Sequence, residues 1–433
     1  MMPSIAAHTL GCKVNQYDTQ AMLELFQQAG YQIVQMDGPA DVYLVNTCTV
    51  TGTGDKKSLQ LIRKIRREHA SASLIICGCM AQERGMDLLS MGADLVLGTQ
   101  RRNEVVMLLR QVRATGQPVC AVEPLKDGQP FERLSITTQN EHTRATLKIQ
   151  EGCNNHCSYC IIPSVRGPIR SRPPEDIREE VSRLSHAGFR EIVLTGIHLC
   201  SYGRDLEPAL SLLDAIRLVQ EEEGILRIRL GSLEPTVATP AFASELRKMD
   251  KICPQFHLAL QSGSDSVLAR MKRRYNSAQF LQAVDNLRYE FPDAAFTTDI
   301  LTGFPGETDL EFEETKAMIR KVGFARIHVF PYSPRPHPPA AGMPGQLSSA
   351  EKERRTRELI ALGNLVAREY LSRWVGRETS FLPEEKVNDH WEGYTPEYIR
   401  VRLDPKDECC SGIPVRIRLL HAGPRLMSGQ IIE

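Results

Sequence analysis

Three cysteines lie within eight residues near the middle of the chain, at Cys153, Cys157 and Cys160. A thiolate is a good ligand for iron, and three thiolates at this spacing can bind three irons of a four-iron, four-sulfur cluster. The fourth iron then has no protein ligand and is open to a small molecule. Zinc usually takes two Cys pairs or Cys/His sets separated by longer loops, so the spacing favours an iron–sulfur cluster.

Three further cysteines, Cys12, Cys48 and Cys79, each follow a segment that is expected to be a strand. Loops after successive strands of a parallel sheet emerge at one edge, so these thiols could meet in space. Gly11 and Gly78 precede two of them and allow the backbone to turn tightly around a bulky group. Most free cysteines are buried small side chains, however, so the spacing alone leaves a purely structural role open.

The bulk composition is that of an ordinary globular protein. The chain has 433 residues, which predicts two or three domains, and its formal net charge is zero, which gives no hint of a nucleic-acid partner. Its first residues lack a signal-peptide pattern and no run of 18 apolar residues occurs, so we expect a cytoplasmic protein that does not enter the membrane. Twelve cysteines in such a chain indicate metal or redox chemistry instead of disulfides.

The N-terminal part alternates short apolar runs with helical patterns, which predicts a doubly wound α/β domain with helices on both faces of a parallel sheet. The expected strands cover residues 5–10, 42–45, 74–77 and 95–97, and the expected helices lie near 19–29 and 57–69. The stretch from about 116 to 144 is polar and weakly periodic, which is typical of a linker.

A second alternating stretch predicts a partial (β/α)6 barrel, with its functional loops at the C-terminal ends of the strands. A helix over 350–371 then leads to a β-rich segment that predicts a small antiparallel β-barrel. The predicted domains are 1–115, a linker over 116–138, the partial barrel over 139–371 and the β-barrel over 372–433. The expected barrel strands cover 146–149, 191–194, 227–230, 256–260, 295–301 and 326–330, followed by 379–382, 398–403, 415–420 and 427–432.

Three stretches of the chain resemble motifs of the methylthiotransferases, which are radical S-adenosylmethionine (SAM) enzymes. They cover residues 11–16, 46–51 and 152–163, and the resemblance extends over essentially the whole chain. It implies a methylthiotransferase N-terminal domain, a radical SAM core and a C-terminal TRAM domain that contacts RNA. Carried onto the matching positions, it implies that Cys12, Cys48 and Cys79 bind a second [4Fe-4S] cluster.

The two clusters would divide the chemistry, as the resemblance implies. The cluster at Cys153, Cys157 and Cys160 would bind and cleave SAM, and the second would hold the sulfur that is inserted. No side chain is assigned as a catalytic acid or base, because the cofactor carries the radical chemistry and the protein supplies position. The residues expected to bind SAM are Tyr159, Thr195, Gly196, Ser232, Glu234, Gln261 and Asp299. For Tyr159 a place in the core is the alternative, and for Glu234 a solvated loop.

Basic residues gather at three places in the sequence. Solvated helix faces are the ordinary explanation, but near a cluster such groups could hold RNA phosphates. The set Arg166, Arg170 and Arg172 directly follows the cysteine motif and is the predicted RNA contact. The others are Arg270, Lys272, Arg273 and Arg274, and Arg63, Lys64, Arg66 and Arg67. Residues 391–399 resemble the middle of a TRAM domain, where aromatic rings either stack on bases or form the core.

Within the family the chain resembles most closely the subgroup that modifies N6-threonylcarbamoyladenosine. Residues 12–17, 154–155 and 329–333 carry that resemblance, whereas residues 337–340 depart from the usual Gly-Thr-Pro-Ala, which puts any contact of that loop in doubt. The predicted function is 2-methylthiolation of this nucleoside at tRNA position 37. Its partners would be tRNA, a sulfur donor and an electron donor of the flavodoxin or ferredoxin type.

Other functions stay open at this point. Related subgroups modify N6-isopentenyladenosine in tRNA or an aspartate of a ribosomal protein. The chain could also be a radical SAM enzyme of another reaction type, or an RNA-binding protein whose clusters are structural.

Overall fold

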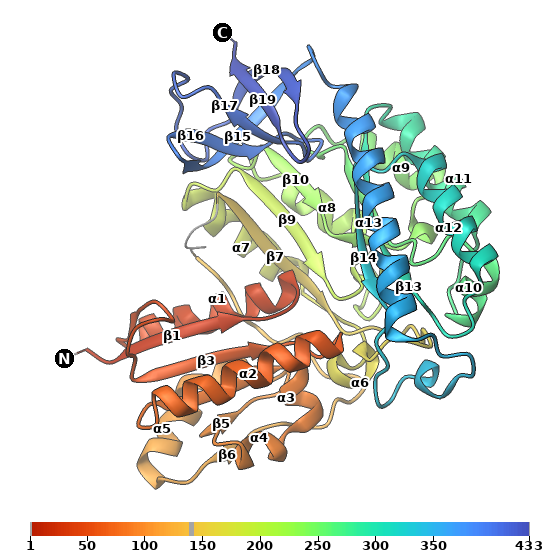
Figure 1. Cartoon of the computed structure of the whole chain (residues 1–433). Helices are drawn as coiled ribbons and strands as arrows, with labels where there is room; N and C mark the ends of the chain where they lie inside the picture. Colours follow the sequence, from red (N-terminus) through yellow and green to blue (C-terminus); the bar gives the residue numbers. More distant parts are fainter. Residues whose placement is uncertain (1, 138–142, 433) are drawn as a thin grey trace.

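A six-stranded parallel sheet forms the N-terminal part of the protein, in a computed structural model that describes residues 2–137 and 143–432. Apolar side chains cover both faces of the sheet, with α1 and α5 on one face and α2 and α4 on the other (Figure 1). The predicted doubly wound class is therefore confirmed. In sheet order the strands are β2 (Gln32–Ile33), β1 (Ser4–Thr9), β3 (Val42–Thr47), β4 (Ser73–Gly78), β5 (Leu95–Val96) and β6 (Val119–Cys120). The helices are α1 (Lys13–Gln28), α2 (Gly52–Glu68), α3 (Cys79–Arg84), α4 (Met86–Ser90), η1 (Arg102–Glu104) and α5 (Val105–Thr115).

Helix α1 begins at Lys13, six residues before the start that the apolar periodicity predicts. Its first turns bury the polar side chains of Asn15 and Asp18, which a search for apolar periodicity does not detect. Strand β6 pairs with β5 although it lies in the segment expected to be a linker, so the sheet continues past residue 115. The expected boundary at 138–139 lies outside the described residues.

The central part contains the six parallel strands of the predicted partial barrel and two short additional strands, in two four-stranded sheets. The first has the order β10-β9-β7-β8, in which the short β8 is antiparallel to β7, and the second has the order β11-β12-β13-β14. A parallel bridge joins Ile228 of β10 to Ile252, which precedes β12. The strands are β7 (Arg144–Glu151), β8 (Arg170–Ser171), β9 (Glu191–Gly196), β10 (Arg227–Leu230), β11 (Ser232–Leu233), β12 (Gln255–Leu258), β13 (Ala295–Thr302) and β14 (Arg326–Pro331).

Helices cover the outside of this partial barrel, and their apolar sides join the strands in one large core (Figure 1). They are α7 (Pro174–His186), η2 (Leu199–Ser201), α8 (Leu212–Gln220), η3 (Pro235–Val237), α9 (Pro240–Arg247), α10 (Asp265–Arg270), α11 (Ser277–Glu290), α12 (Asp309–Val322) and α13 (Ser349–Ser372). Two short helices belong to other apolar clusters: α6 (Ile162–Arg166) and η4 (Pro339–Gly342). Within the described ranges, no helix is both long and apolar enough to cross a membrane.

The C-terminal segment is a closed five-stranded barrel with the order β15-β16-β17-β19-β18. Four of its strand pairs are antiparallel, and β17 pairs with β19 in parallel. The barrel rests on the N-terminal ends of the central strands, where Arg229 donates hydrogen bonds to the backbone oxygens of Thr395 and Pro396 at 3.2 and 3.0 Å. Its strands are β15 (Glu378–Val387), β16 (His390–Tyr394), β17 (Arg400–Leu403), β18 (Val415–Ala422) and β19 (Met427–Ile431).

Candidate functional site

The loop from the end of β7 to the start of α6 carries the closely spaced cysteines. The backbone N–H of Cys153 donates to the oxygen of Gly167 at 2.9 Å, and that of Ser158 donates to the oxygen of Met271 at 3.0 Å. In return, the backbone N–H of Ala340 donates to the oxygen of Ser158 at 2.8 Å. The loop at 337–340, whose sequence departs from the family pattern, therefore still contacts the cysteine motif.

Gly152 is required at the start of this loop. Its φ of +73° is unfavourable for residues with a side chain, and an added Cβ would lie 1.8 Å from the backbone oxygen of Pro168. The strand β7 can therefore pass directly into the loop of Cys153 only because this position has no side chain.

Cys12, Cys48 and Cys79 lie at one edge of the N-terminal sheet. The parallel register pairs Thr9 with Asn46 and Thr47 with Gly78, so the residues that follow β1, β3 and β4 emerge together. Cys12 caps α1, and Cys79 is the first residue of α3. Gly11 leaves the space that the Cys48 thiol occupies, because a Cβ at position 11 would lie 3.1 Å from the Cys48 sulfur.

Burial raises the pKa of Cys48 and Cys79 in one set and of Cys153 and Cys160 in the other, which favours the protonated thiol at these four positions. Burial raises the pKa of Cys79 to about 12, with Arg166 opposing the shift and the thiols of Cys12 and Cys48 adding to it. Burial likewise raises the pKa of Cys160 to about 12. Iron binding at either set must therefore release protons.

The chemistry of the donors suits an iron–sulfur cluster at each set. Each set offers three sulfur donors, and a cluster presents a separate iron to each thiolate. The soft donors and the small residues beside them fit a cluster at each set.

The other residues expected to bind the cofactor lie mostly where strands of the partial barrel end. Thr195 and Gly196 end β9, Ser232 begins β11, and Gln261 follows β12 with a φ of +64°. Asp299 lies on β13, and its backbone oxygen accepts a hydrogen bond from the N–H of Gln261 at 2.9 Å. Tyr159 is half-buried and packs against an apolar group that includes Val267, Met271, Phe304 and Tyr332.

Glu234 lies in a polar group beside Cys157. Its carboxylate is 3.1 Å from Nε2 of His198 and 3.4 Å from Nη2 of Arg273, and Nη1 of Arg273 donates to the Cys157 sulfur at 3.1 Å. Burial would raise the pKa of Glu234, but the hydrogen bond from His198 and the charge of Arg273 outweigh it and lower that pKa. An ionised carboxylate and a guanidinium therefore lie together next to this cysteine.

Sequence reasoning missed Arg273 and His198 as members of the site. Arg273 was grouped with Arg270 and Lys272 in a basic helix, and only Arg273 of these contacts a cysteine of the motif. The signal in the sequence is weak, because the helix α10 has already ended at Arg270 and the chain then turns through Lys272, which has a φ of +55°.

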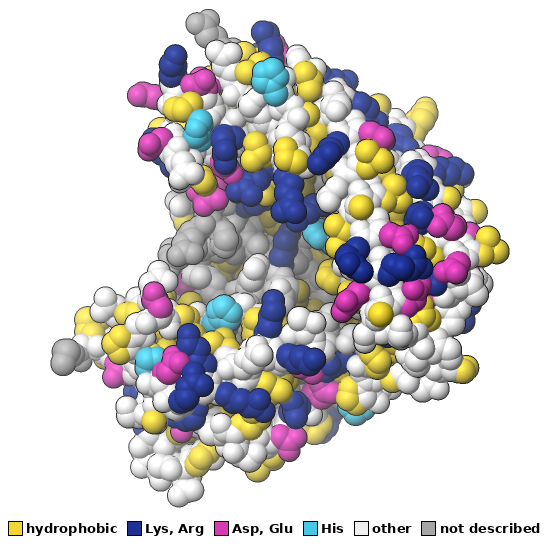
Figure 2. Space-filling model, in the orientation of Figure 1, with side chains coloured by type: hydrophobic (Ala, Val, Ile, Leu, Met, Phe, Trp, Pro, Cys, Tyr) yellow, Lys and Arg dark blue, Asp and Glu magenta, His cyan; other side chains and the backbone are white. Residues whose placement is uncertain are grey.

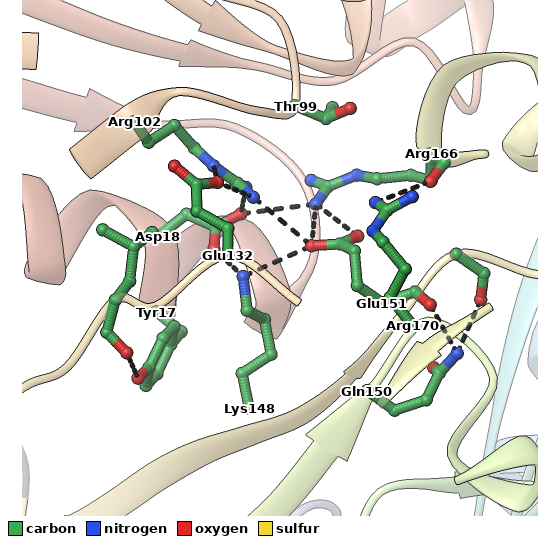
Figure 3. A network of polar contacts seen from close by, with 12 residues as sticks. Tyr17, Asp18, Thr99, Arg102, Glu132, Lys148, Gln150, Glu151, Arg166 and Arg170 are labelled. Carbon is green, nitrogen blue, oxygen red and sulfur yellow. Dashed lines mark hydrogen bonds and ion pairs between the residues drawn. The ribbon is translucent and has the colours of Figure 1, made fainter. Parts of the chain in front are cut away.

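A buried network of charges joins the N-terminal sheet to the partial barrel (Figure 3). Three cations, Arg102, Lys148 and Arg166, meet three carboxylates, Asp18, Glu132 and Glu151, so their formal charges cancel. Nη2 of Arg102 is 2.7 Å from Glu132, and Nη1 of Arg166 is 2.9 Å from Glu151. Lys148 lies 3.2 Å from Glu151 and also pairs with Asp18, which in turn contacts Arg102.

Arg166 connects this network to both cysteine sets. It lies on α6, six residues after Cys160, and its Nε donates to the sulfur of Cys79 at 3.1 Å. Cys79 also packs against Ile161, which follows Cys160 directly, and against Val165 of α6. The segment that continues from Cys160 into α6 therefore lies against Cys79 of the other set.

The structure corrects the expectation that Arg166, Arg170 and Arg172 contact RNA. All three side chains are buried. Arg166 pairs with Glu151, Arg170 donates to the backbone oxygen of Arg166 at 3.0 Å, and Arg172 pairs with Glu180. Guanidinium groups that are buried and already paired are not positioned to meet phosphates.

Comparisons with known proteins cover the whole chain. Residues 147–319 match the radical SAM superfamily, and residues 4–98 match uncharacterized protein family UPF0004. A threonylcarbamoyladenosine tRNA methylthiotransferase MtaB of Bacillus subtilis (strain 168) is 40% identical over 438 residues, covering 100% of this chain and 97% of that protein. An MtaB of Thermotoga maritima is 36% identical over 92% of this chain and 91% of its own length.

A differently named relative and a solved structure are also similar. A tRNA-2-methylthio-N(6)-dimethylallyladenosine synthase of Moorella thermoacetica is 34% identical, covering 98% of this chain and 97% of its own. The structure of the radical SAM methyltransferase TsrM from Kitasatospora setae aligns with a TM-score of 0.58 and 13% identity, over 79% of this chain and 77% of that one. At that identity the alignment shows a shared fold.

Replacing Arg102 tests the charge network. Arg102→Met leaves Asp18 and Glu132 without this partner, so we expect a loss of about 3–5 kcal/mol in the free energy of unfolding by urea denaturation. The matched control is its neighbour Arg101, whose ion pairs to Glu104 and Glu123 lie at the surface; Arg101→Met should cost under about 1 kcal/mol. Equal losses for the two variants would show that the network does not stabilise the fold.

Replacing Gly152 tests the entry into the cysteine loop. Gly152→Ala adds backbone strain and a clash with Pro168, so we expect a loss of about 2–4 kcal/mol in the free energy of unfolding. Gly116→Ala is the control, because Gly116 has a similar φ of +65° with nothing within 4 Å of an added Cβ. It should cost about 1–2 kcal/mol, and a loss at Gly152 no larger than this would contradict the clash.

Proposed function

The chain belongs to the methylthiotransferase family of radical SAM enzymes, and from this premise we propose that it converts N6-threonylcarbamoyladenosine in tRNA to the 2-methylthio derivative. The protein is an enzyme that modifies tRNA, and its family uses a [4Fe-4S] cluster and SAM. Beyond the family, we propose two things: which nucleoside is modified, and that the chain holds a second cluster.

The observation that carries the choice of nucleoside is the ranking of full-length relatives. The proteins named for threonylcarbamoyladenosine are 40% and 36% identical to this chain, whereas those named for dimethylallyladenosine reach 34% and 35% over similar lengths. The resemblance of residues 12–17 to the threonylcarbamoyl subgroup supports the same choice.

Cys153, Cys157 and Cys160 would hold the first cluster. When bound, this cluster and SAM supply a radical that can remove hydrogen from an unactivated carbon. The chain's own part is to position the reactants, and contacts of Ser158 with Met271 and Ala340 hold the loop in place. The paired charges of Glu234 and Arg273 beside Cys157 suit a ligand such as SAM that carries both an amino group and a carboxylate.

Cys12, Cys48 and Cys79 would hold the second cluster, which supplies the sulfur site. Arg166 keeps Cys79 next to the loop of the first set, so that sulfur and radical would act on one nucleoside. Arg335 supports the same edge from the loop after β14, since it lies 2.7 Å from Asp55 and also contacts Thr49, next to Cys48. A sulfur donor and an electron donor complete the proposal.

A hollow between the N-terminal sheet and the C-terminal barrel is the proposed place for tRNA, with Lys and Arg side chains on both rims (Figure 2). In the barrel, which we propose is a TRAM domain, the rings of Tyr394 and Tyr398 stack on each other at 4.8 Å. Arg144 lies over Tyr394 at 4.7 Å and Arg229 over Tyr398 at 4.9 Å. The two tyrosine rings therefore contact arginines of the central domain, and they are not free to stack on bases.

Iron analysis tests the two-cluster proposal. The reconstituted native chain should hold about eight irons, and the triple variant Cys153→Ala/Cys157→Ala/Cys160→Ala about four. The triple variant Cys12→Ala/Cys48→Ala/Cys79→Ala should also hold about four, should still cleave SAM and should give no methylthio product. The control Cys409→Ala/Cys410→Ala, in the C-terminal barrel, should keep the native iron content. Four irons in the native chain would refute the second cluster.

Mass spectrometry of tRNA nucleosides tests the substrate. Incubated with SAM, reductant and a sulfur source, the native chain should convert threonylcarbamoyl tRNA and leave an unmodified transcript unreacted. Isopentenyladenosine tRNA is the matched comparison, because its N6 group is apolar where the threonylcarbamoyl group carries a carboxylate. Efficient conversion of the isopentenyl substrate with none of the threonylcarbamoyl one would move the chain to the neighbouring subgroup.

A further inference from the structure

Helix α2 carries a line of positive side chains on its outer face. Ser58, Ile62 and Ile65 are buried toward the sheet, Leu59 and Leu61 are half-buried beside them, and the opposite face of the helix is exposed. Repeats of three and four residues place side chains on one face of a helix. The exposed cations are Lys56, Lys57, Arg63, Lys64 and Arg67. Because the net charge of the whole chain is zero, this excess is local.

The protein itself neutralises little of this charge. Glu68 is the acidic residue on the same face, 2.9 Å from Arg67 and 3.9 Å from Lys64. Across the described residues, no hydrogen bond or ion pair joins the side chains of Lys56, Lys57 or Arg63 to a carboxylate. Arg66 shows the contrast, because it turns inward and pairs with Asp94 at 2.7 Å.

The line of charges starts at the second cysteine set and leads away from it. Helix α2 begins four residues after Cys48, and the N–H of Gly52 donates to the hydroxyl of Ser333 at 3.0 Å. From Lys56 to Arg67 the helix rises about 17 Å, which is enough for several phosphates of an RNA strand. Lys and Arg side chains gather over α2, along the lower rim of the hollow (Figures 1 and 2).

We propose that the outer face of α2 binds the phosphate backbone of the tRNA, so that the N-terminal domain shares this task with the C-terminal barrel. The inference rests on the proposed function for the identity of the partner. The fully buried centre of a protein–protein interface is typically more apolar than the rest of the surface. The exposed side chains of α2 are all polar or charged, which suits a chain of phosphates.

Binding of an unmodified tRNA transcript at several salt concentrations tests the proposal. The variant Lys57→Gln/Arg63→Gln/Lys64→Gln/Arg67→Gln should bind at least about tenfold more weakly than the native chain at low salt. The slope of log Kd against log salt should fall by roughly one for each phosphate contact that is lost. The substitutions lie on an exposed face, and native iron content and thermal unfolding would verify that the variant is folded.

A matched control removes the same number of charges elsewhere. The control variant replaces four exposed cations of α12 and α13: Arg320→Gln/Lys321→Gln/Arg357→Gln/Arg368→Gln. We expect it to keep the native Kd and the native slope. If both variants weaken binding equally, the effect is one of total charge and the assignment to α2 is wrong.

The remaining outcomes separate this inference from the function it rests on. A native Kd and slope for the α2 variant would overturn the inference and leave the proposed function standing. Normal tRNA binding with slower reduction by flavodoxin would also overturn it and make α2 a protein-docking face. Failure of the native chain to bind tRNA at all would contradict the proposed function itself.

Discussion

Six charges, five of them buried and the sixth (Glu132) half-buried, lie between the N-terminal sheet and the partial barrel and set the geometry on which the rest of the molecule depends. Moving an ion out of water costs several kcal/mol, and the attraction between partners offsets that cost only where each charge meets its counterion closely. Arg102 and Asp18 come from the N-terminal part, Lys148 and Glu151 from β7, and Arg166 from α6. The two sheets can therefore pack only in the register that pairs these groups, and that register places Cys79 against Arg166.

A second constraint is the direction of the strands. The N-terminal sheet is parallel, and β7, β9 and β10 of the central part are parallel to one another, so each set delivers its loops at the C-terminal ends of its strands. The contact of Cys79 with Arg166 and Val165 brings these two edges together. Helix α6 fills the space between them, with Cys160 before it and Cys79 beside it. The small residues Gly11 and Gly152 are needed at these edges, where a side chain would occupy the place of a thiol or of the backbone.

Much of this could be predicted from the sequence, because strands and cysteine spacing are local signals. The six parallel strands of the partial barrel and the strand-end positions of Cys12, Cys48 and Cys79 follow from alternating apolar runs. The start of α1 was misplaced because Asn15 and Asp18 are buried polar residues, and apolar periodicity cannot recognise them. The arginines after Cys160 were mistaken for surface groups for the same reason: their carboxylate partners lie far away in sequence, and only the fold brings them together.

Arg166 has a consequence for how the chain can be divided. A fragment that ends in the region between the N-terminal sheet and β7 would keep Cys12, Cys48 and Cys79 together, since all three belong to one sheet. It would nevertheless lose Arg166, Lys148 and Glu151, so Asp18 and Arg102 would face water and Cys79 would lose its hydrogen-bond donor. The N-terminal unit thus contains every strand of its sheet, but it depends on the central part for the counterions of its buried charges. Grafting it onto another radical SAM core would require an arginine in that core at the position of Arg166 in α6.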